Sequence, residues 1–298
     1  MTGPRVVTSP EAVPARRSGV PVGTAISAWW LGQAGFLIEA AEVRLVIDAY
    51  LSDTLAVKYR GKPFPHVRMM PPPIEPGSLR DVDLVIVTHG HTDHLDPGTL
   101  GPLAAANPAC RFVVPAAHTA LAVSRGVPSG RLVPASAFRA FEVAGVRLTP
   151  LPSAHEEISI DAAGEHLFLG YVVELGNAVL YHSGDCVPYP DLPSRLLGHE
   201  LDLALLPVNG RDARRSQGGI PGNFTLEEAV NLAHACRVDT VIGHHFGMFD
   251  FNTIDLASAR ARTAEQRRVA TFLLAEPGLR YDVRRPTRRE ARGIGTGS

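Results

Sequence analysis

Cysteine is scarce in this chain, and the few cysteines show no pattern. Cys110, Cys186 and Cys236 have neither the paired framework of a disulfide-rich protein nor a Cys-x-x-Cys spacing. This usage favours a reducing compartment, so we expect a cytoplasmic protein.

Long apolar runs and an excess of one charge are also missing. No run approaches the roughly 18 apolar residues of a membrane span, and residues 1–21 lack the continuous apolar stretch of a secretory signal. The formal net charge is −1, which gives no global attraction to nucleic acid or to an anionic membrane. Basic and aromatic residues are not interleaved as on a nucleic-acid surface. We therefore expect a small-molecule substrate as partner, no nucleic acid and no membrane, while a homo-oligomer stays open.

Length and composition predict one globular domain with additions at both ends. The chain has 298 residues, 45% of them hydrophobic and 20% charged, and it can bury a large core. We predict a loose N-terminal extension over residues 1–21, the main domain over residues 22–282, and a basic, disordered tail over residues 283–298.

The most informative segment is Thr88–His94, with the sequence Thr-His-Gly-His-Thr-Asp-His. It follows the apolar run Leu84–Val87, which predicts a buried strand. His89 and His91 stand two residues apart and so share a face in an extended chain. The pair Asp93–His94 follows where the chain bends away. This arrangement suits two adjacent cations, one held by each pair.

Other metal-capable side chains also follow short apolar runs, and so stand at predicted strand ends. Taken singly, each is more often an ordinary loop residue or a turn former than a ligand. Taken with the first motif, they can all converge on one sheet edge, where a carboxylate can bridge two cations. These candidates are His155, Asp185 and the pair His244–His245.

His-x-His-x-Asp-His, followed by an isolated histidine, a Ser-Gly-Asp and a late histidine after a strand, resembles the metallo-β-lactamase superfamily. The resemblance spans about Ser27 to Phe251. A closer likeness is to the L-ascorbate-6-phosphate lactonase group of that superfamily. The stretches that carry it are Trp29–Gly32, Arg68–Met70, Tyr181–Asp185 and Val241–His245. The chain departs from this group around residues 209–217 and has a shorter tail.

The resemblance implies a ligand set for two divalent transition metal ions. The first metal would take His89, His91 and His155. The second would take Asp93, His94 and His245, and Asp185 would bridge the two. His245 is preferred to His244 because it stands three residues after Ile242. Imidazoles and carboxylates without thiolate fit zinc or manganese, with iron as a further candidate.

The resemblance also implies the fold, a four-layer αββα sandwich of the α/β class with metals at the edge shared by two sheets. Periodicity alone gives only mixed α/β. Expected strands lie at Ala25–Trp30, Phe36–Glu39, Arg44–Asp48, Leu84–Thr88 and Arg111–Val114. Expected helices lie at Thr99–Ala106, Thr119–Arg125, Asp191–Leu197, Leu226–Arg237 and Ala257–Leu274. Thr225 and Glu228 have capping-box spacing before the fourth of these helices.

Two polar regions are candidates for binding substrate. The proline-rich stretch from Asp48 to Asp81 contains His66 and Arg68. This stretch suits either a lid over an anionic or polar substrate or a surface excursion that covers a sheet edge. Asn209 and Arg211 lie in a polar turn after an apolar run, where Arg211 can grip a phosphate or carboxylate, or else form a local ion pair.

The residues that would orient the ligand imidazoles are Asp48, Thr88, Asp96 and His182. For His182, a histidine satisfied within the core is an equal alternative. Two cations about 3.5 to 4 Å apart lower the pKa of a shared water, and Asp93 would orient the resulting hydroxide as the catalytic carboxylate.

We therefore expect a metal-dependent hydrolase that opens a lactone, ester or phosphoester of a small polar metabolite, either neutral or anionic. The enzymatic alternatives are a phosphodiesterase of phospholipase-D-like type and a mononuclear iron dioxygenase of persulfide type. A non-catalytic metal-binding module is disfavoured, since the whole ligand pattern is present.

Overall fold

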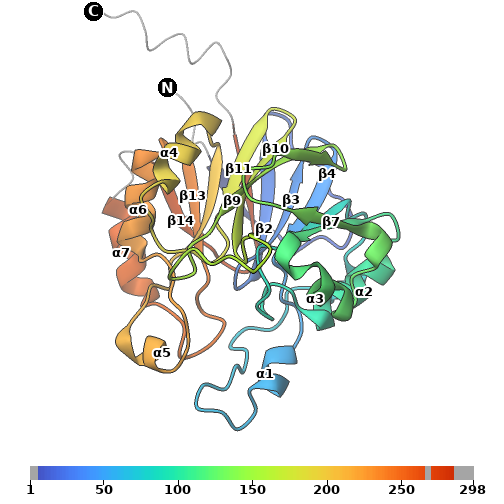
Figure 1. The fold of residues 1–298 in the computed structure, drawn as a ribbon. Helices are drawn as coiled ribbons and strands as arrows, with labels where there is room; N and C mark the ends of the chain where they lie inside the picture. Colours follow the sequence, from blue (N-terminus) through green and yellow to red (C-terminus); the bar gives the residue numbers. More distant parts are fainter. Residues whose placement is uncertain (1–5, 266–269, 285–298) are drawn as a thin grey trace, which may run out of the picture.

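The computed structural model describes residues 6–265 and 270–284, and within them two β-sheets form the centre of the molecule (Figure 1). The first sheet has the order β1-β15-β2-β3-β4-β5-β6-β7, and the second has the order β14-β13-β12-β11-β10-β9-β8. Strands of the first sheet are β1 Val6–Pro10, β15 Leu279–Val283, β2 Ile26–Gly32, β3 Gly35–Ala40, β4 Val43–Ile47, β5 Leu84–Ile86, β6 Arg111–Pro115 and β7 Leu132–Ala135. Strands of the second sheet are β14 Thr271–Leu274, β13 Thr240–His244, β12 Leu203–Pro207, β11 Ala178–His182, β10 Leu169–Leu175, β9 Val146–Pro152 and β8 Phe141–Val143.

Helices cover both outer faces of the paired sheets. In Figure 1, α6 and α7 lie on one side and α2 and α3 on the other, while α1 and α5 lie beyond one end of the strands. The α-helices are α1 Thr54–Lys58, α2 Pro97–Ala106, α3 Thr119–Ser124, α4 Leu192–Leu196, α5 Ala213–Gln217, α6 Leu226–Ala235 and α7 Leu256–Glu265. Short 3-10 helices occur at Pro76–Ser78, Ala116–His118, Ser129–Arg131 and Leu197–His199.

The core lies in two layers, which explains why whole strands are apolar. All of β2 is buried, and its alternate side chains enter different clusters: Trp30 packs between the two sheets, and Trp29 packs under α2. Burial on both faces calls for continuous apolar runs rather than strict alternation. Helix, sheet, sheet and helix thus form four layers, and the predicted metallo-β-lactamase fold is confirmed.

Most expected elements form close to their predicted bounds, and α6 shows why. Thr225 Oγ1 accepts a hydrogen bond from the Glu228 N–H, and the Glu228 carboxylate accepts one from the Thr225 N–H, which is the predicted capping box. The expected helix over residues 257–274 is wrong in its last part. There, Thr271–Leu274 is strand β14, which pairs parallel with β13. Its apolar residues complete an edge of the second sheet, a long-range pairing that helical spacing does not reveal.

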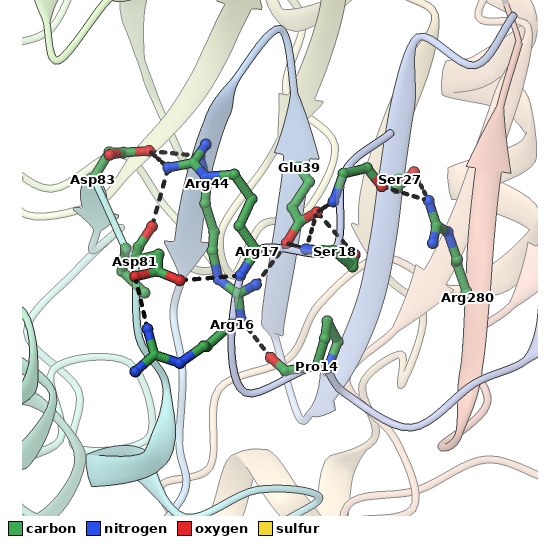
Figure 2. Close-up of polar contacts among 12 residues, drawn as sticks. Pro14, Arg16, Arg17, Ser18, Ser27, Glu39, Arg44, Asp81, Asp83 and Arg280 are labelled. Carbon is green, nitrogen blue, oxygen red and sulfur yellow. Dashed lines mark hydrogen bonds and ion pairs between the residues drawn. The ribbon is translucent and has the colours of Figure 1, made fainter. Parts of the chain in front are cut away.

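The N-terminal segment packs on the first sheet and is not loose over residues 6–21, which corrects the sequence prediction. Strand β1 pairs antiparallel with β15. On β3 and β4 of the same sheet, Glu39 and Arg44 form a buried ion pair, with 2.6 Å between Glu39 Oε1 and Arg44 Nη1 (Figure 2). The Glu39 carboxylate accepts hydrogen bonds from the N–H groups of Ser18 and Gly19, and Arg44 donates to the Pro14 carbonyl. Burying two charges requires such additional partners, and the N-terminal segment supplies them.

Two further regions complete the description. The segment from Asp48 to Asp81 contains α1 and one 3-10 helix but is otherwise irregular. The basic tail predicted over residues 283–298 begins inside the sheet, because Val283 is the last residue of β15. Residues 285–298 lie outside the described residues. Within residues 6–265 and 270–284, no helix has the length and apolar character needed to cross a bilayer.

Candidate metal centre

The predicted ligands come from four loops that leave the ends of four strands. His89 to His94 follow β5, His155 follows β9, Asp185 follows β11, and His245 follows β13. Strands β11, β12 and β13 are parallel, and β9 has the same direction because it is antiparallel to β10, as β11 is. Their carboxyl ends therefore open at one edge, where β5 of the first sheet also ends.

The first group consists of His89, His91 and His155. One nitrogen from each imidazole lies within 4.8 Å of the nitrogens of the other two. The ring centroids are 4.7 Å apart for His89 and His91, 5.0 Å for His91 and His155, and 5.4 Å for His89 and His155. His89 and His155 are buried, while His91 is exposed. Three nitrogens at this separation fit around one cation.

The second group consists of Asp93, His94 and His245, again with ligand atoms within 4.8 Å of one another. Asp185 lies between the groups. Its Oδ1 is 3.0 Å from His245 Nε2 and 3.4 Å from His94 Nε2, and its carboxylate also forms a close set with His89 and His94. All seven predicted ligands are thus brought to one place.

Unpartnered polar atoms at this place fit a metal cation. His89 Nε2, His94 Nε2, His245 Nε2, Asp185 Oδ1 and both ring nitrogens of His155 are buried and have no hydrogen-bond partner. Buried polar atoms without partners are costly, so most native ones are satisfied. Here the unpartnered atoms converge, and imidazole and carboxylate are donors that zinc, manganese and iron accept.

Asp48 and Thr88 orient two of the imidazoles, as predicted. Asp48 Oδ2 is 2.7 Å from His94 Nδ1 and accepts the Thr88 hydroxyl at 2.6 Å. Because that hydroxyl proton goes to Asp48, Thr88 Oγ1 accepts from His89 Nδ1, which is 3.0 Å away. Both imidazoles then carry their proton on Nδ1 and present Nε2 to the cluster.

The other two predicted orienting residues have different roles. Asp96 caps α2, where its side chain accepts from the Gly98 N–H and from the Thr99 hydroxyl. His182 Nε2 lies 2.9 Å from the Ala34 carbonyl, and its Nδ1 accepts from the Gly184 N–H. The prediction of a contact with a ligand is wrong for Asp96, and His182 is a histidine satisfied within the core.

Glycine is required in the turn that presents Asp185. Gly184 has φ +61°, and a Cβ on it would lie 2.8 Å from the Thr88 side chain. The turn after β11 therefore presses against the residue that orients the first motif. This close approach fixes Asp185 relative to the loop after β5.

The two adjacent histidines after β13 separate at the end of the strand. His244 is the last strand residue, fully buried, stacked on His182 with ring centroids 5.1 Å apart and edge-on to Phe36. His245 has φ +68°, so the chain leaves the extended conformation there and its imidazole reaches Asp185. The structure brings His245, and not His244, to the cluster.

Burial and the carboxylates set opposite protonation tendencies in the cluster. Burial lowers the pKa of His89 well below its ordinary value and lowers the pKa of His155 to about 4. Burial would also lower the pKa of His94. The carboxylates of Asp48, Asp185 and Asp93 outweigh burial and raise this pKa well above the usual range. Without metal, a proton neutralises this carboxylate-rich position, and a metal cation can replace that proton.

Gln33 is a site residue that the sequence reasoning missed. It lies between β2 and β3, is fully buried, and its Nε2 donates to Asp93 Oδ2 at 2.9 Å. The backbone carbonyl of Gln33 accepts a hydrogen bond from the His245 N–H at 3.0 Å. Gln33 therefore contacts two members of the second group. A polar residue in a tight turn between two apolar strands was the available signal.

A cavity of about 530 Å³ opens beside the cluster. His91, Asp93, His155, Asp185 and His245 line one part of it. Further lining comes from the segment around α1, from residues 218–221, and from Phe249, Phe251 and Asn252. The stretch from Asp48 to Asp81 therefore contributes a wall of the cavity, as the lid interpretation predicts.

Of the four predicted substrate contacts, only His66 lines this cavity. Arg68 donates to backbone carbonyls, including that of Tyr50 at 2.9 Å. Asn209 donates to the side chain of Asn252, which does line the cavity, at 2.7 Å. Arg211 pairs with both carboxylate oxygens of Glu228, at 2.6 and 2.7 Å. The geometry gives Arg68, Asn209 and Arg211 internal partners, and their substrate role stays a prediction.

The comparison with known families agrees with this fold. The sequence profile of the beta-lactamase superfamily domain matches residues 43–246. This span holds the first motif and ends just after His245, and it covers more than half of the chain. The chain belongs to this family.

Relatives and solved structures place the likeness more finely. The chain is similar to a UPF0173 metal-dependent hydrolase of Aeropyrum pernix, with 25% identity covering 85% of this chain and 96% of the relative. It is also similar to N-acyl-phosphatidylethanolamine-hydrolyzing phospholipase D 1 of Caenorhabditis elegans, with 25% identity covering 76% of this chain and 65% of the relative. An isothiocyanate hydrolase from Delia radicum gut bacteria has a similar fold, with TM-score 0.68 and 19% identity. The match covers 85% of this chain and 97% of that hydrolase. The finer likeness to the lactonase group stays a prediction.

Proposed function

We propose that this member of the superfamily is a metal-dependent hydrolase with two divalent transition metal ions. Its substrate would be a lactone, ester or phosphoester of a small polar metabolite. The observation that carries the proposal is the position of Asp185, whose Oδ1 lies 3.0 and 3.4 Å from two histidines of the second group while its carboxylate also meets His89 of the first. A carboxylate shared by two groups of ligands suits a pair of cations.

The ligand roles follow from this arrangement. His89, His91 and His155 would hold one cation, and Asp93, His94 and His245 the other. When bound, such cations supply Lewis acidity, which lowers the pKa of water and polarises a substrate carbonyl or phosphoryl oxygen. Zinc or manganese suits these donors, and iron is also compatible with them.

In this proposal Asp93 would move a proton. Its side chain lines the cavity and remains 17% exposed, whereas Asp185 is 6% exposed. Burial raises the pKa of Asp93, but His94 and His245 outweigh burial and keep it below the ordinary value. An ionised Asp93, steadied by the Gln33 amide, can accept a proton from water and return it to a leaving oxygen.

Metal content tests the binuclear part of the proposal. Protein purified without added metal and then loaded with zinc or manganese should hold two ions per chain by mass spectrometry. Asp185→Asn should weaken the second ion and lower turnover by orders of magnitude while the fold survives. A chain that cannot be loaded beyond one ion would contradict the binuclear centre and favour the mononuclear iron alternative.

A substrate panel tests the reaction. We expect the loaded protein to hydrolyse a lactone or an aryl ester, and Asp93→Asn to abolish that turnover. The panel should include L-ascorbate-6-phosphate lactone, because the sequence resembles that group. If the loaded protein hydrolyses none of the lactones, esters and phosphodiesters offered, the proposed function fails.

Phosphodiester hydrolysis is the second candidate. The similarity to a phospholipase D that acts on a phosphodiester lipid favours it. Preference for bis(p-nitrophenyl) phosphate over aryl esters and lactones would select this reaction. The same ligands would serve, since two cations stabilise the charge of a phosphoryl oxygen as well as that of a carbonyl oxygen.

A further inference from the structure

A second wall of this cavity is rich in aromatic rings. Tyr59 and His66 stack with ring centroids 4.1 Å apart, and the His66 ring lies 4.8 Å from Phe249 and 4.9 Å from Phe251. Phe64 meets Phe251 at 5.2 Å. All five rings line the cavity. Tyr59, Phe64, His66 and Phe251 are only partly buried, so their remaining surface faces open space and can accept a flat apolar group.

The histidine of this wall is part of its apolar surface. Burial lowers the pKa of His66, and its Nδ1 is engaged with the Phe64 carbonyl at 2.8 Å. A neutral imidazole held in this way presents its ring face rather than a charge. The wall therefore recognises shape and apolar surface.

Positive charge is placed in the same cavity. The lysines of this chain are Lys58 and Lys62, and both line the cavity. Lys58 Nζ lies 3.2 Å from the hydroxyl of Thr92, the neighbour of Asp93 in the sequence. Lys58 has three donors, of which Thr92 takes one, and its Nζ also lies 5.2 Å from the centre of the Tyr59 ring. A donor therefore remains for a ligand close to the metal cluster.

Two arginines near the cavity are paired with carboxylates, and the lysines differ from them. Arg211 is paired with Glu228, and Arg215 with Asp212. Within residues 6–265 and 270–284, none of the ion pairs involves Lys58 or Lys62. Two cations without a protein carboxylate, both in the cavity wall, indicate that the negative partner comes from the ligand.

We propose that the cavity binds an amphipathic anion, with a flat apolar body against the aromatic wall and a carboxylate or phosphate oxygen on Lys58. Lys62 reinforces the positive potential at the same wall. The proposal rests on the proposed function, because it names the substrate class of that hydrolase. The proposal also assigns the role of holding the anion to the lysines. Arg211 and Arg68 do not take this role, because they have internal partners.

Binding of inert probes tests the proposal apart from turnover. The metal-loaded full chain is titrated calorimetrically with phenylacetate, acetate, benzyl alcohol and benzylphosphonate. We expect phenylacetate to bind at least tenfold more tightly than either acetate or benzyl alcohol. Benzylphosphonate then distinguishes the two anions, because tighter binding than phenylacetate selects a phosphate-like group and weaker binding selects a carboxylate.

Lys58→Met and the control Arg60→Met separate the lysine from general charge. Both variants remove one cation from the same exposed segment, but Arg60 does not line the cavity. Because a hydrogen bond to a charged group contributes about 1.5–3 kcal/mol, Lys58→Met should weaken phenylacetate about tenfold or more. It should leave benzyl alcohol unchanged. Arg60→Met should change neither. If Lys58→Met and the wild type bind phenylacetate with equal affinity, the assignment of the anion to Lys58 is wrong. Both proteins carry the same metals, so the contribution of the metals cancels in this comparison.

The aromatic wall is tested with Tyr59→Leu against Phe138→Leu. Phe138 is an exposed aromatic residue outside the cavity. Tyr59→Leu should weaken phenylacetate several-fold and leave acetate unchanged. A thermal melt matching that of Phe138→Leu would show that the fold survives. Equal binding of phenylacetate and acetate by the wild type would overturn the apolar part.

A matched ester pair connects the binding site to the reaction. p-Nitrophenyl butyrate and p-nitrophenyl hydrogen glutarate carry the same leaving group and differ by one remote carboxylate. Lys58→Met should raise KM for the glutarate ester by a larger factor than KM for the butyrate ester. Hydrolysis of both esters with no such difference overturns only this inference, whereas probe binding without any turnover would contradict only the hydrolase.

Discussion

A single backbone conformation decides which of two adjacent imidazoles reaches the cluster. His245 adopts φ +68° immediately after β13, whereas His244 stays in the strand and packs against His182 and Phe36. A non-glycine residue in this left-handed region costs of order 1–3 kcal/mol. Such strain persists where the surroundings fix it, and here the Gln33 carbonyl holds the His245 N–H.

We expect His245→Ala to lose one of two metal ions and most activity. His244→Ala should keep both ions but lower the free energy of unfolding by about 1–3 kcal/mol, because it leaves a hole in the core. Metal analysis and urea unfolding of both variants measure this difference. The reverse pattern would transfer the ligand to His244.

Gln33 allows a second test at the scale of one residue. Gln33→Met keeps the length of the side chain but cannot donate to Asp93 Oδ2. Removing such an outer partner of a metal ligand typically weakens metal affinity about 10–100-fold. We expect this loss for one metal only, measured by competition with a chelator. The ion of the His89, His91 and His155 group is the internal control, and an equal loss of both ions would indicate general damage to the fold.

Among the elements, α6 shows how a charged residue can be engaged by a helix cap. The Glu228 carboxylate accepts a hydrogen bond from the Thr225 N–H in the cap of α6, and it also accepts one from each terminal nitrogen of Arg211. The interaction with Arg211 lowers the pKa of Glu228. Arg211 therefore stabilises the entry of the helix that packs on β12 and β13.

Arg211→Ala should lower the free energy of unfolding by about 0.5–1 kcal/mol, as expected for a partly exposed pair. KM for an anionic substrate should stay unchanged. A double-mutant cycle with Glu228→Gln, followed by urea unfolding, isolates the coupling between the two side chains. A raised KM with no loss of stability would instead support the substrate contact that the sequence predicts.

At the scale of the whole molecule, the folded metal-free protein should depend on pH through its buried imidazoles. Burial lowers the pKa of His155 to about 4, whereas an ordinary imidazole titrates near 6.5. Between these values the unfolded chain binds a proton that the folded chain does not bind. Stability from this group is therefore present above about pH 6.5 and is lost as the pH falls towards 4.

This difference corresponds to on the order of 3 kcal/mol. Urea unfolding of the metal-free protein at pH 7, 5.5 and 4 should show the loss, and His155→Gln should show less of it. Equal pH dependence of the variant and the wild type would contradict the assignment. The raised pKa of His94 acts in the other direction, because its contribution is lost as the pH rises.

The sequence by itself determined which residues are candidate metal ligands. His89 to His94, His155 and Asp185 could be found because metal ligands at strand ends leave a dense local signature after apolar runs. The strands and the α6 capping box could be found because their periodicity and spacing are local. The family likeness then supplied the four-layer arrangement.

Only the tertiary structure decided the rest, because each remaining feature joins segments far apart in the chain. Strand β14 exists through its pairing with β13, and the N-terminal segment is ordered by the buried pair of Glu39 and Arg44. Gln33 donates to Asp93, and Lys58 lines the cavity, only when both sheets have formed. The partner of Arg211 was likewise not predictable, because a free guanidinium and one paired with a residue of a helix cap cannot be distinguished in sequence.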